Sequence, residues 1–194
     1  WQRHFAWSVS KVITATTLAM LAGAGRVAMD APVERYLPWL SGTAWAGTPL
    51  QAVADMGSGI DCLDSDGYQD PSTCIYRLEE SLDITAPTGR ESSLPTVLAG
   101  MTRRGPPDAR NEYVSANTAV LGLVIETVAG KPFAAVVREQ LWDRLGPEAD
   151  ALIAISGDGY PYVAGGFSLR LRDLARFGEA FTATARLGIV DDAL

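Results

Sequence analysis

The order of apolar and polar positions predicts a chain built mainly from helices. The longest apolar stretch runs from Val12 to Ala24, and together with Ser8 at its start it predicts a helix that Gly25 ends. Residues 118–128 are apolar on most sides, which is typical of a buried helix. Pro132 opens an amphipathic helix that extends to about residue 145.

Shorter patterns predict the elements between these three helices. Thr48-Pro49 is typical of a capped helix start. The other predicted pieces are a strand end or loop over residues 1–7, helices near 48–56, 72–82, 94–104 and 171–181, a short apolar segment at 152–155 and a glycine-rich stretch at 157–166. Helices outnumber strands, which suits the helical half of a two-part α/β enzyme.

Composition and charge narrow the classes of protein. The chain has 194 residues, of which 47% are hydrophobic and 20% charged, so it can bury a sizeable core. The net charge is -7 without a basic run, so we expect no nucleic-acid partner. The stretch from Val12 to Ala24 is too short and too polar to span a membrane. Because the chain opens at Trp1 without a methionine, we interpret residues 1–194 as a partial domain, truncated at both ends.

Few residues could bind a metal. The single histidine, His4, and two cysteines are too few for a zinc site. The acidic loop at 61–74 fits a calcium loop poorly, because Cys62 falls at the first ligand position and Thr73 where the bidentate glutamate belongs. We therefore expect no metal and no cofactor. Cys62 and Cys74 are expected to be free thiols of a cytoplasmic protein, with one loop disulfide as the alternative.

The start of the first predicted helix carries the clearest chemistry. Ser8 and Lys11 are three positions apart and therefore share a helix face. A serine hydroxyl becomes a good nucleophile when a base takes its proton, and a lysine in a buried helix can be that base, because desolvation disfavours its charged form. Only two of the 16 lysine and arginine residues are lysines, and an arginine cannot serve as a base. The alternative is an N-cap serine beside a lysine that extends to solvent.

Three stretches at these spacings resemble the serine β-lactamase-like hydrolases, which include class C β-lactamases, D-alanyl-D-alanine peptidases and family VIII esterases. Ser8-Val9-Ser10-Lys11 resembles the nucleophile motif S-x-x-K. Tyr113 resembles the tyrosine of the second motif, and Gly165-Gly166 with the helix that follows resembles the family's double glycine. The resemblance implies an α/β fold in which an antiparallel sheet is flanked by helices and joined to an all-helical part. In this chain the helical part would dominate and flanking strands would be missing.

Within that superfamily the chain is most similar to the aminohexanoate-dimer (nylon oligomer) hydrolases. Four pieces carry this likeness: Ser8-Val9-Ser10-Lys11; Asp55-Met56 with Ser58, Ile60-Asp61, Tyr68 and Asp70-Pro71; Tyr113 with Ser115-Ala116-Asn117-Thr118; and Gly165-Gly166 through Arg176. The resemblance implies that Tyr68 contacts the reacting amide and that Glu79 lies near the amino end of the substrate. The alternatives are a loop tyrosine that covers the core and a solvated helix face. Gly165 and Gly166 could let the backbone approach a ligand, or could form an ordinary turn.

Two departures from the family pattern concern the second and third motifs. The family has asparagine two residues after the tyrosine, whereas this chain has Ser115 there and Asn117 later. A rival interpretation takes Ser115-Ala116-Asn117 as the serine-x-asparagine motif of class A lactamases, and both residues are substrate-binding candidates. The third motif, lysine or histidine followed by serine or threonine and glycine, does not occur up to Leu194. The resemblance places it beyond that residue.

The resemblance implies a serine hydrolase whose partner is a small-molecule ester or amide. Ser8 would form an acyl-enzyme that water releases, while Lys11 and Tyr113 share the proton transfers. The backbone N–H of Ser8 would be one oxyanion donor. The alternatives are a β-lactamase or D-alanyl-D-alanine peptidase-like enzyme, or a non-catalytic penicillin-binding-like sensor. The sequence makes no prediction of the oligomeric state.

Overall fold

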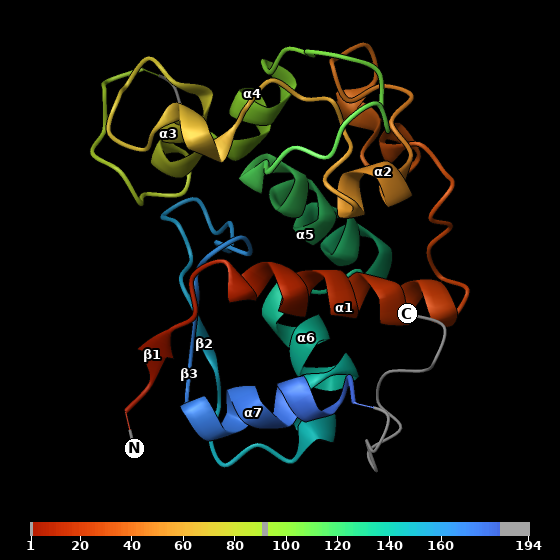
Figure 1. Cartoon of the computed structure of the whole chain (residues 1–194), viewed down its shortest axis with the longest axis vertical. Coiled ribbons are helices and arrows are strands. Elements are labelled where there is room, and N and C mark those ends of the chain that lie inside the picture. The colour runs from red at the N-terminus through yellow and green to blue at the C-terminus, as the bar shows by residue number, and fades with distance from the viewer. Residues whose placement is uncertain (1, 91–92, 183–194) are drawn as a thin grey trace.

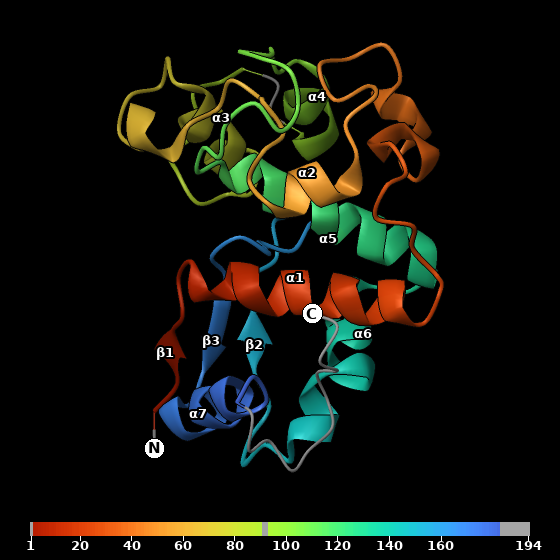
Figure 2. The same ribbon diagram turned by 45° about the vertical axis from the view of Figure 1, so that its right-hand side comes forward.

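One long helix, α1 (Val9–Gly23), crosses the middle of the molecule (Figure 1). The computed structural model describes residues 2–90 and 93–182 of the chain. Helix α5 (Ser115–Ala129) packs on one side of α1 and α6 (Phe133–Gln140) on the other, as both views show (Figures 1 and 2). Ile13, Leu18 and Leu21 of α1 are buried in a continuous core. This helix therefore joins the two parts of the molecule.

A small antiparallel sheet lies at the N-terminal end of α1. Its strands are β1 (His4–Phe5), β2 (Leu152–Ile153) and β3 (Phe167–Leu169), in the order β1-β3-β2. His4 pairs with Leu169 and Leu152 with Ser168, and helix α7 (Leu171–Glu179) follows β3 directly. Because β1 leads within a few residues into α1, the sheet fixes where α1 begins.

The remaining elements lie on the side of α5 away from the sheet (Figure 2). They are the short helices α2 (Leu50–Ala54), α3 (Cys74–Glu80) and α4 (Leu94–Ala99), with 3-10 helices at Val33–Arg35, Pro38–Leu40 and Asp64–Asp66. A fourth 3-10 helix, Trp142–Leu145, follows α6. Long loops connect these short pieces, so this part depends on packing against α5 rather than on helix length.

Helix α5 is apolar on most of its surface because it lies inside the protein. Its central residues, from Ala119 to Ile125, are buried except Leu123, which is partly exposed. Across the described ranges, no single helix is long and apolar enough to cross a membrane; α5 and the segment after it would reach that length only as a pair bent by 78°.

The structure confirms most predicted helices and corrects their ends. Helix α1 ends as predicted, since Gly25 has a φ of +70°. The prediction that Thr48 caps α2 is wrong, because Pro49 is the N-cap and the Thr48 hydroxyl instead accepts a hydrogen bond from Arg103 Nη2 at 2.7 Å. Helix α4 is shorter than predicted, because residue 103 pairs with Ile60 in a β-bridge.

The prediction of two free thiols is also wrong. Cys62 and Cys74 form a disulfide with their Cα atoms 5.0 Å apart. The bond closes the acidic loop between them and attaches it to the first residue of α3. Disulfides are typical of oxidising compartments, so this bond does not favour the cytoplasmic expectation, which stays a prediction.

Candidate active site

Ser8 and Lys11 meet at the first turn of α1. Ser8 occupies the N-cap position with a helical backbone (φ -64°, ψ -9°), and its side chain makes no capping hydrogen bond. Lys11 Nζ donates to Ser8 Oγ at 3.0 Å and to the carbonyl of Ala164 at 2.9 Å. The lysine is only 8% exposed. The alternative of an N-cap serine beside a solvent-exposed lysine therefore does not describe this pair.

Tyr113 lies beside the same pair, with its ring against the Lys11 amine. Lys11 Nζ lies 4.9 Å from the centroid of the Tyr113 ring, which is the distance of a cation–π contact. The side chain is half-exposed, at 49%. Within the described residues, the Tyr113 hydroxyl makes no hydrogen bond to Ser8 or to Lys11. The structure thus brings the three predicted catalytic residues together, and their sharing of protons stays a prediction.

Glu79 lies inside the protein rather than on a solvated helix face. It is 7% exposed, and its Oε1 accepts a hydrogen bond from the Tyr162 hydroxyl at 2.9 Å. Burial raises the pKa of Glu79 and the nearby Asp64 carboxylate adds to this, against the opposing effects of the Tyr162 hydrogen bond and the Lys11 charge. Burial and the Glu79 carboxylate in turn raise the pKa of Tyr162, so this phenol stays protonated and remains the donor.

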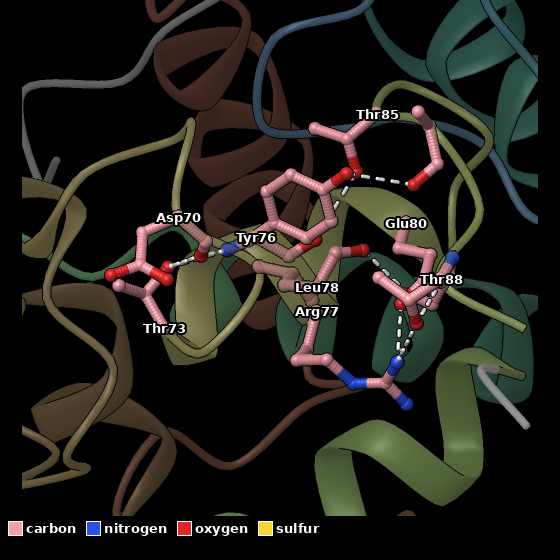
Figure 3. Close-up of polar contacts among 10 residues, drawn as sticks. Asp70, Thr73, Tyr76, Arg77, Leu78, Glu80, Thr85 and Thr88 are labelled. Carbon is pink, nitrogen blue, oxygen red and sulfur yellow. Dashed lines mark hydrogen bonds and ion pairs between the residues drawn. The ribbon is translucent and has the colours of Figure 1, made fainter. Parts of the chain in front are cut away.

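The adjacent Glu80 has a different, local role. Figure 3 shows its carboxylate joined to Arg77 and to Thr88, whose hydroxyl donates to Glu80 Oε1 at 2.7 Å. Burial raises the pKa of Glu80, but the hydrogen bonds from Thr88 and the charge of Arg77 outweigh it and hold the pKa below its usual range. Thr73 begins the same helix by accepting a hydrogen bond from the Tyr76 N–H at 3.3 Å (Figure 3). Glu80 therefore fixes the chain after α3, whereas Glu79 bonds to Tyr162.

Tyr68 is fixed by a carboxylate that the sequence did not single out. Its hydroxyl donates to Asp64 Oδ2 at 2.7 Å, while 43% of the residue is exposed. Burial and the Asp64 carboxylate raise the pKa of Tyr68. In the sequence, Asp64 resembles the other aspartates of its loop, and no local pattern distinguishes it from Asp66. Burial is what distinguishes it, and burial here is a tertiary property.

Ser115 and Asn117 are buried at the start of α5. The Ser115 N–H and hydroxyl donate to Asp64 at 2.7 and 2.6 Å. Asn117 Nδ2 lies 3.6 Å from the sulfur of Met56, and its Oδ1 has no hydrogen-bond partner among the described residues. These contacts lie within the fold, and neither residue bonds to Ser8 or Lys11. The geometry does not favour direct substrate contact by this pair, and that role stays a prediction.

Tyr162 leaves no room for a side chain at Gly165 or Gly166. A Cβ atom on Gly165 would lie 2.7 Å from Cζ of Tyr162, and one on Gly166 would lie 2.6 Å from the Tyr162 carbonyl oxygen. Both glycines are buried. They allow close approach of the backbone, as predicted, but the atoms that approach belong to Tyr162. A role toward substrate stays a prediction.

The segment before these glycines is attached to α1. The hydroxyl of Thr14 donates to the carbonyl of Val163 at 3.1 Å, and Ser10 Oγ accepts from the Phe167 N–H at 3.2 Å. With the Lys11–Ala164 hydrogen bond, these contacts hold residues 163–167 along the first turns of α1. Over the described ranges, no group of three or more His, Cys, Asp or Glu side chains is placed to hold a metal ion.

The chain has relatives in sequence. Residues 2–191 match the family model described as Beta-lactamase. The 6-aminohexanoate-dimer hydrolase of Paenarthrobacter ureafaciens is 32% identical over 178 residues, which make up 91% of this chain and 45% of that protein.

Solved structures agree with this result. A Bacillus anthracis protein, provisionally named a 6-aminohexanoate-dimer hydrolase, superposes with a TM-score of 0.80 at 25% identity, over 92% of this chain and 47% of that one. A class C beta-lactamase in complex with cefoxitin has a TM-score of 0.72 at 16% identity, over 97% of this chain and 53% of that one, and so shares the fold. The chain spans about half the length of these relatives. The predicted fold class and the resemblance are confirmed: the chain belongs to the β-lactamase family.

Proposed function

We propose that the full-length protein is a serine hydrolase that cleaves a small ester or amide through an acyl-enzyme on Ser8. The observation that carries the proposal is the hydrogen bond between the buried Lys11 amine and Ser8 Oγ, at 3.0 Å. A neutral amine has two N–H groups and one lone pair. For the reaction, the direction of the Lys11–Ser8 hydrogen bond would reverse: one N–H of the neutral amine donates to Ala164, and the lone pair takes the proton of the Ser8 hydroxyl as the serine oxygen attacks the carbonyl.

The start of α1 supports the charge that develops during the attack. Among the described residues, none accepts a hydrogen bond from the Ser8 N–H, and this group lies at the positive end of the helix. A backbone donor of this kind stabilises the oxyanion of the tetrahedral intermediate, by about 3–4 kcal/mol in comparable sites. After proton transfer, the Lys11 cation lies 4.9 Å from the centroid of the Tyr113 ring, within the distance of a cation–π contact. Tyr113 would then pass its phenolic proton to the leaving group and take a proton from the Lys11 cation, which restores the neutral phenol and the neutral amine.

A linear amide with an amino end is the first substrate to test. The curated relative is named for hydrolysis of an aminohexanoate dimer. In this chain, the carboxyl groups of Glu79 and Asp64 lie near enough to influence each other, and Lys11 influences Glu79. Glu79, which the resemblance places near the amino end of the substrate, would supply the carboxylate for a cationic end.

The test is Ser8→Ala in the full-length protein, assayed with a short-chain p-nitrophenyl ester and with 6-aminohexanoate dimer. Because the variant lacks the nucleophile, turnover should fall by roughly 1,000-fold or more. Ser41→Ala is the matched control, since Ser41 is exposed and remote from α1 in sequence, and its turnover should equal the wild type. Unchanged turnover in Ser8→Ala would end the proposal.

A fluorophosphonate probe and nitrocefin separate the alternatives. Labelling of Ser8 by the probe, together with turnover of the ester or amide by protein that has not met the probe, supports the hydrolase. Stable labelling without turnover would indicate a penicillin-binding-like sensor, and rapid nitrocefin hydrolysis would indicate a β-lactamase. An unlabelled wild-type protein would contradict acylation altogether.

A further inference from the structure

Asp64 is a buried carboxylate beside the site that the proposed chemistry does not use. It is 8% exposed and lies on the 3-10 helix Asp64–Asp66, inside the loop that the disulfide closes. Its carboxylate accepts three hydrogen bonds: from the Tyr68 hydroxyl at 2.7 Å, from the Ser115 N–H at 2.7 Å and from the Ser115 hydroxyl at 2.6 Å. Burial of a charge is tolerated when it is hydrogen-bonded in this way.

The backbone of Asp64 holds the same segment from a second point. Its N–H donates to the carbonyl of Tyr113 at 3.1 Å. Tyr113 and Ser115 are two residues apart, at the point where the chain enters α5. Asp64 therefore holds the segment that carries Tyr113 in two ways, with its own backbone N–H and with its own carboxylate. The same carboxylate also holds the Tyr68 hydroxyl.

We infer that Asp64 is a positioning residue that fixes the Tyr113 segment and the Tyr68 ring relative to the Ser8–Lys11 pair. The inference rests on the proposed function of that pair. Without the carboxylate, the Tyr68 hydroxyl would lose its acceptor and the start of α5 would lose two of the hydrogen bonds that fix it. Both tyrosines are about half exposed, so little packing would replace these bonds.

The chemistry of the three donors requires a carboxylate rather than an amide. Two ionised oxygens offer about four acceptor sites, whereas an asparagine side chain offers one oxygen and an NH2 group that can only donate. In Asp64→Asn, the NH2 group would face either the Ser115 N–H, which lies at Oδ1, or the hydroxyls of Tyr68 and Ser115, which both lie at Oδ2. The donors on that side would lose their acceptor. Burial and the Asp64 carboxylate together raise the pKa of Tyr68, so the carboxylate also helps to keep this phenol protonated as a donor.

The first experiment measures kcat in the full-length protein for Asp64→Asn, for Tyr68→Phe and for the two changes combined. Asp64→Asn should lower kcat by about 10- to 100-fold, because small displacements of catalytic groups have effects of that size. Asp66→Asn is the matched control: it lies on the same short helix, is exposed and should stay within twofold of the wild type.

The combined variant separates positioning from a general loss of stability. If Asp64 acts partly through Tyr68, the double variant loses less than the product of the two single losses. Independent effects that multiply in full, or an Asp64→Asn rate within twofold of the wild type, would overturn the inference.

An alkaline absorbance titration of the tyrosines tests the same contact without activity. Loss of the carboxylate should make Tyr68 ionise at lower pH, so a band present in Asp64→Asn should vanish in the Asp64→Asn/Tyr68→Phe double variant. If the curves of wild type and Asp64→Asn coincide, Asp64 does not hold Tyr68 and the inference fails. This result is independent of Ser8→Ala, which tests the proposed function alone.

A milder change covers the case in which Asp64→Asn does not fold. Ser115→Ala removes one donor and keeps the Asp64 charge and its bond to Tyr68. We expect a several-fold lower kcat with a folded protein by circular dichroism. A folded Ser115→Ala protein with the wild-type rate would argue against positioning through this segment.

Discussion

Neighbouring residues of the same type have opposite roles in this protein. Glu79 and Glu80 are adjacent on α3 and both are buried. Glu79 accepts one hydrogen bond, from the neutral phenol of Tyr162, and burial raises its pKa. Glu80 bonds to the Arg77 cation and twice to Thr88, and its pKa lies below its usual range. The environment, not the residue type, decides which of the two favours the charged form.

This difference predicts opposite effects on the pH dependence of stability. The raised pKa of Glu79 means that the folded state binds its proton more tightly than the unfolded state. Its contribution is complete below the usual glutamate range and is lost as pH rises through the folded pKa. The lowered pKa of Glu80 means the reverse: its contribution is present above the usual range and is lost as pH falls.

Guanidinium unfolding of the wild type, Glu79→Gln and Glu80→Gln from pH 4 to pH 8 checks both signs. The free energy of unfolding of Glu79→Gln should improve relative to the wild type as pH rises. That of Glu80→Gln should worsen relative to the wild type over the same range. Parallel curves for all three proteins would contradict the assigned environments.

At the scale of elements, two short segments place the site. Strand β1 pairs with β3 and leads into α1, which sets Ser8 beside residues 163–167. The disulfide-closed loop carries Asp64, which bonds to the backbone of Tyr113 and to the hydroxyl of Tyr68. Neither segment has enough regular structure to hold its shape alone, so the cross-link and the hydrogen bonds at its ends fix the loop.

Loss of the disulfide should therefore destabilise the protein. The bond joins residues 12 apart, and closing a loop of about this length contributes about 3 kcal/mol in the chain-entropy account. Cys62→Ala/Cys74→Ala should lower the free energy of unfolding by up to that amount in a denaturant titration. Dithiothreitol should shift the wild-type midpoint toward that of the variant and leave the variant unchanged. Equal midpoints for the oxidised wild type and the variant would show that the bond does not constrain the loop.

At the scale of the whole molecule, α1 lies between two parts of the structure and packs against both. The sheet with α6 and α7 lies on one side, and α5 with the short helices α2, α3 and α4 lies on the other (Figures 1 and 2). Side chains of α1 contribute to one continuous core with both parts. We therefore expect the two parts to unfold together.

Ile13→Ala tests this coupling. Ile13 is fully buried, and removing such a side chain from a packed core costs about 2–5 kcal/mol. Val12→Ala, at the exposed neighbouring position, is the control and should change stability by less than about 0.5 kcal/mol. A single transition, shifted equally in far-UV and near-UV circular dichroism, is the expected result for Ile13→Ala. Two separate transitions would show that the parts unfold independently.

The sequence predicted the elements whose signal is local. The apolar stretch before Gly25 predicted α1 and its end, and the serine and lysine three positions apart predicted a shared helix face, because helix geometry depends only on spacing. It also predicted the fold class and the family. It did not predict strand β3, whose three residues become a strand only by pairing with β1 and β2.

The sequence by itself determined that the attacking pair is a serine and a lysine, and that the two side chains share a face of α1. Only the tertiary structure decided that Asp64 is buried while Asp66 is exposed, that Glu79 bonds to Tyr162 and that two cysteines pair. The physical reason is that burial and pairing depend on segments 12 to about 80 residues apart in the chain, and no pattern within one segment records its distant partner.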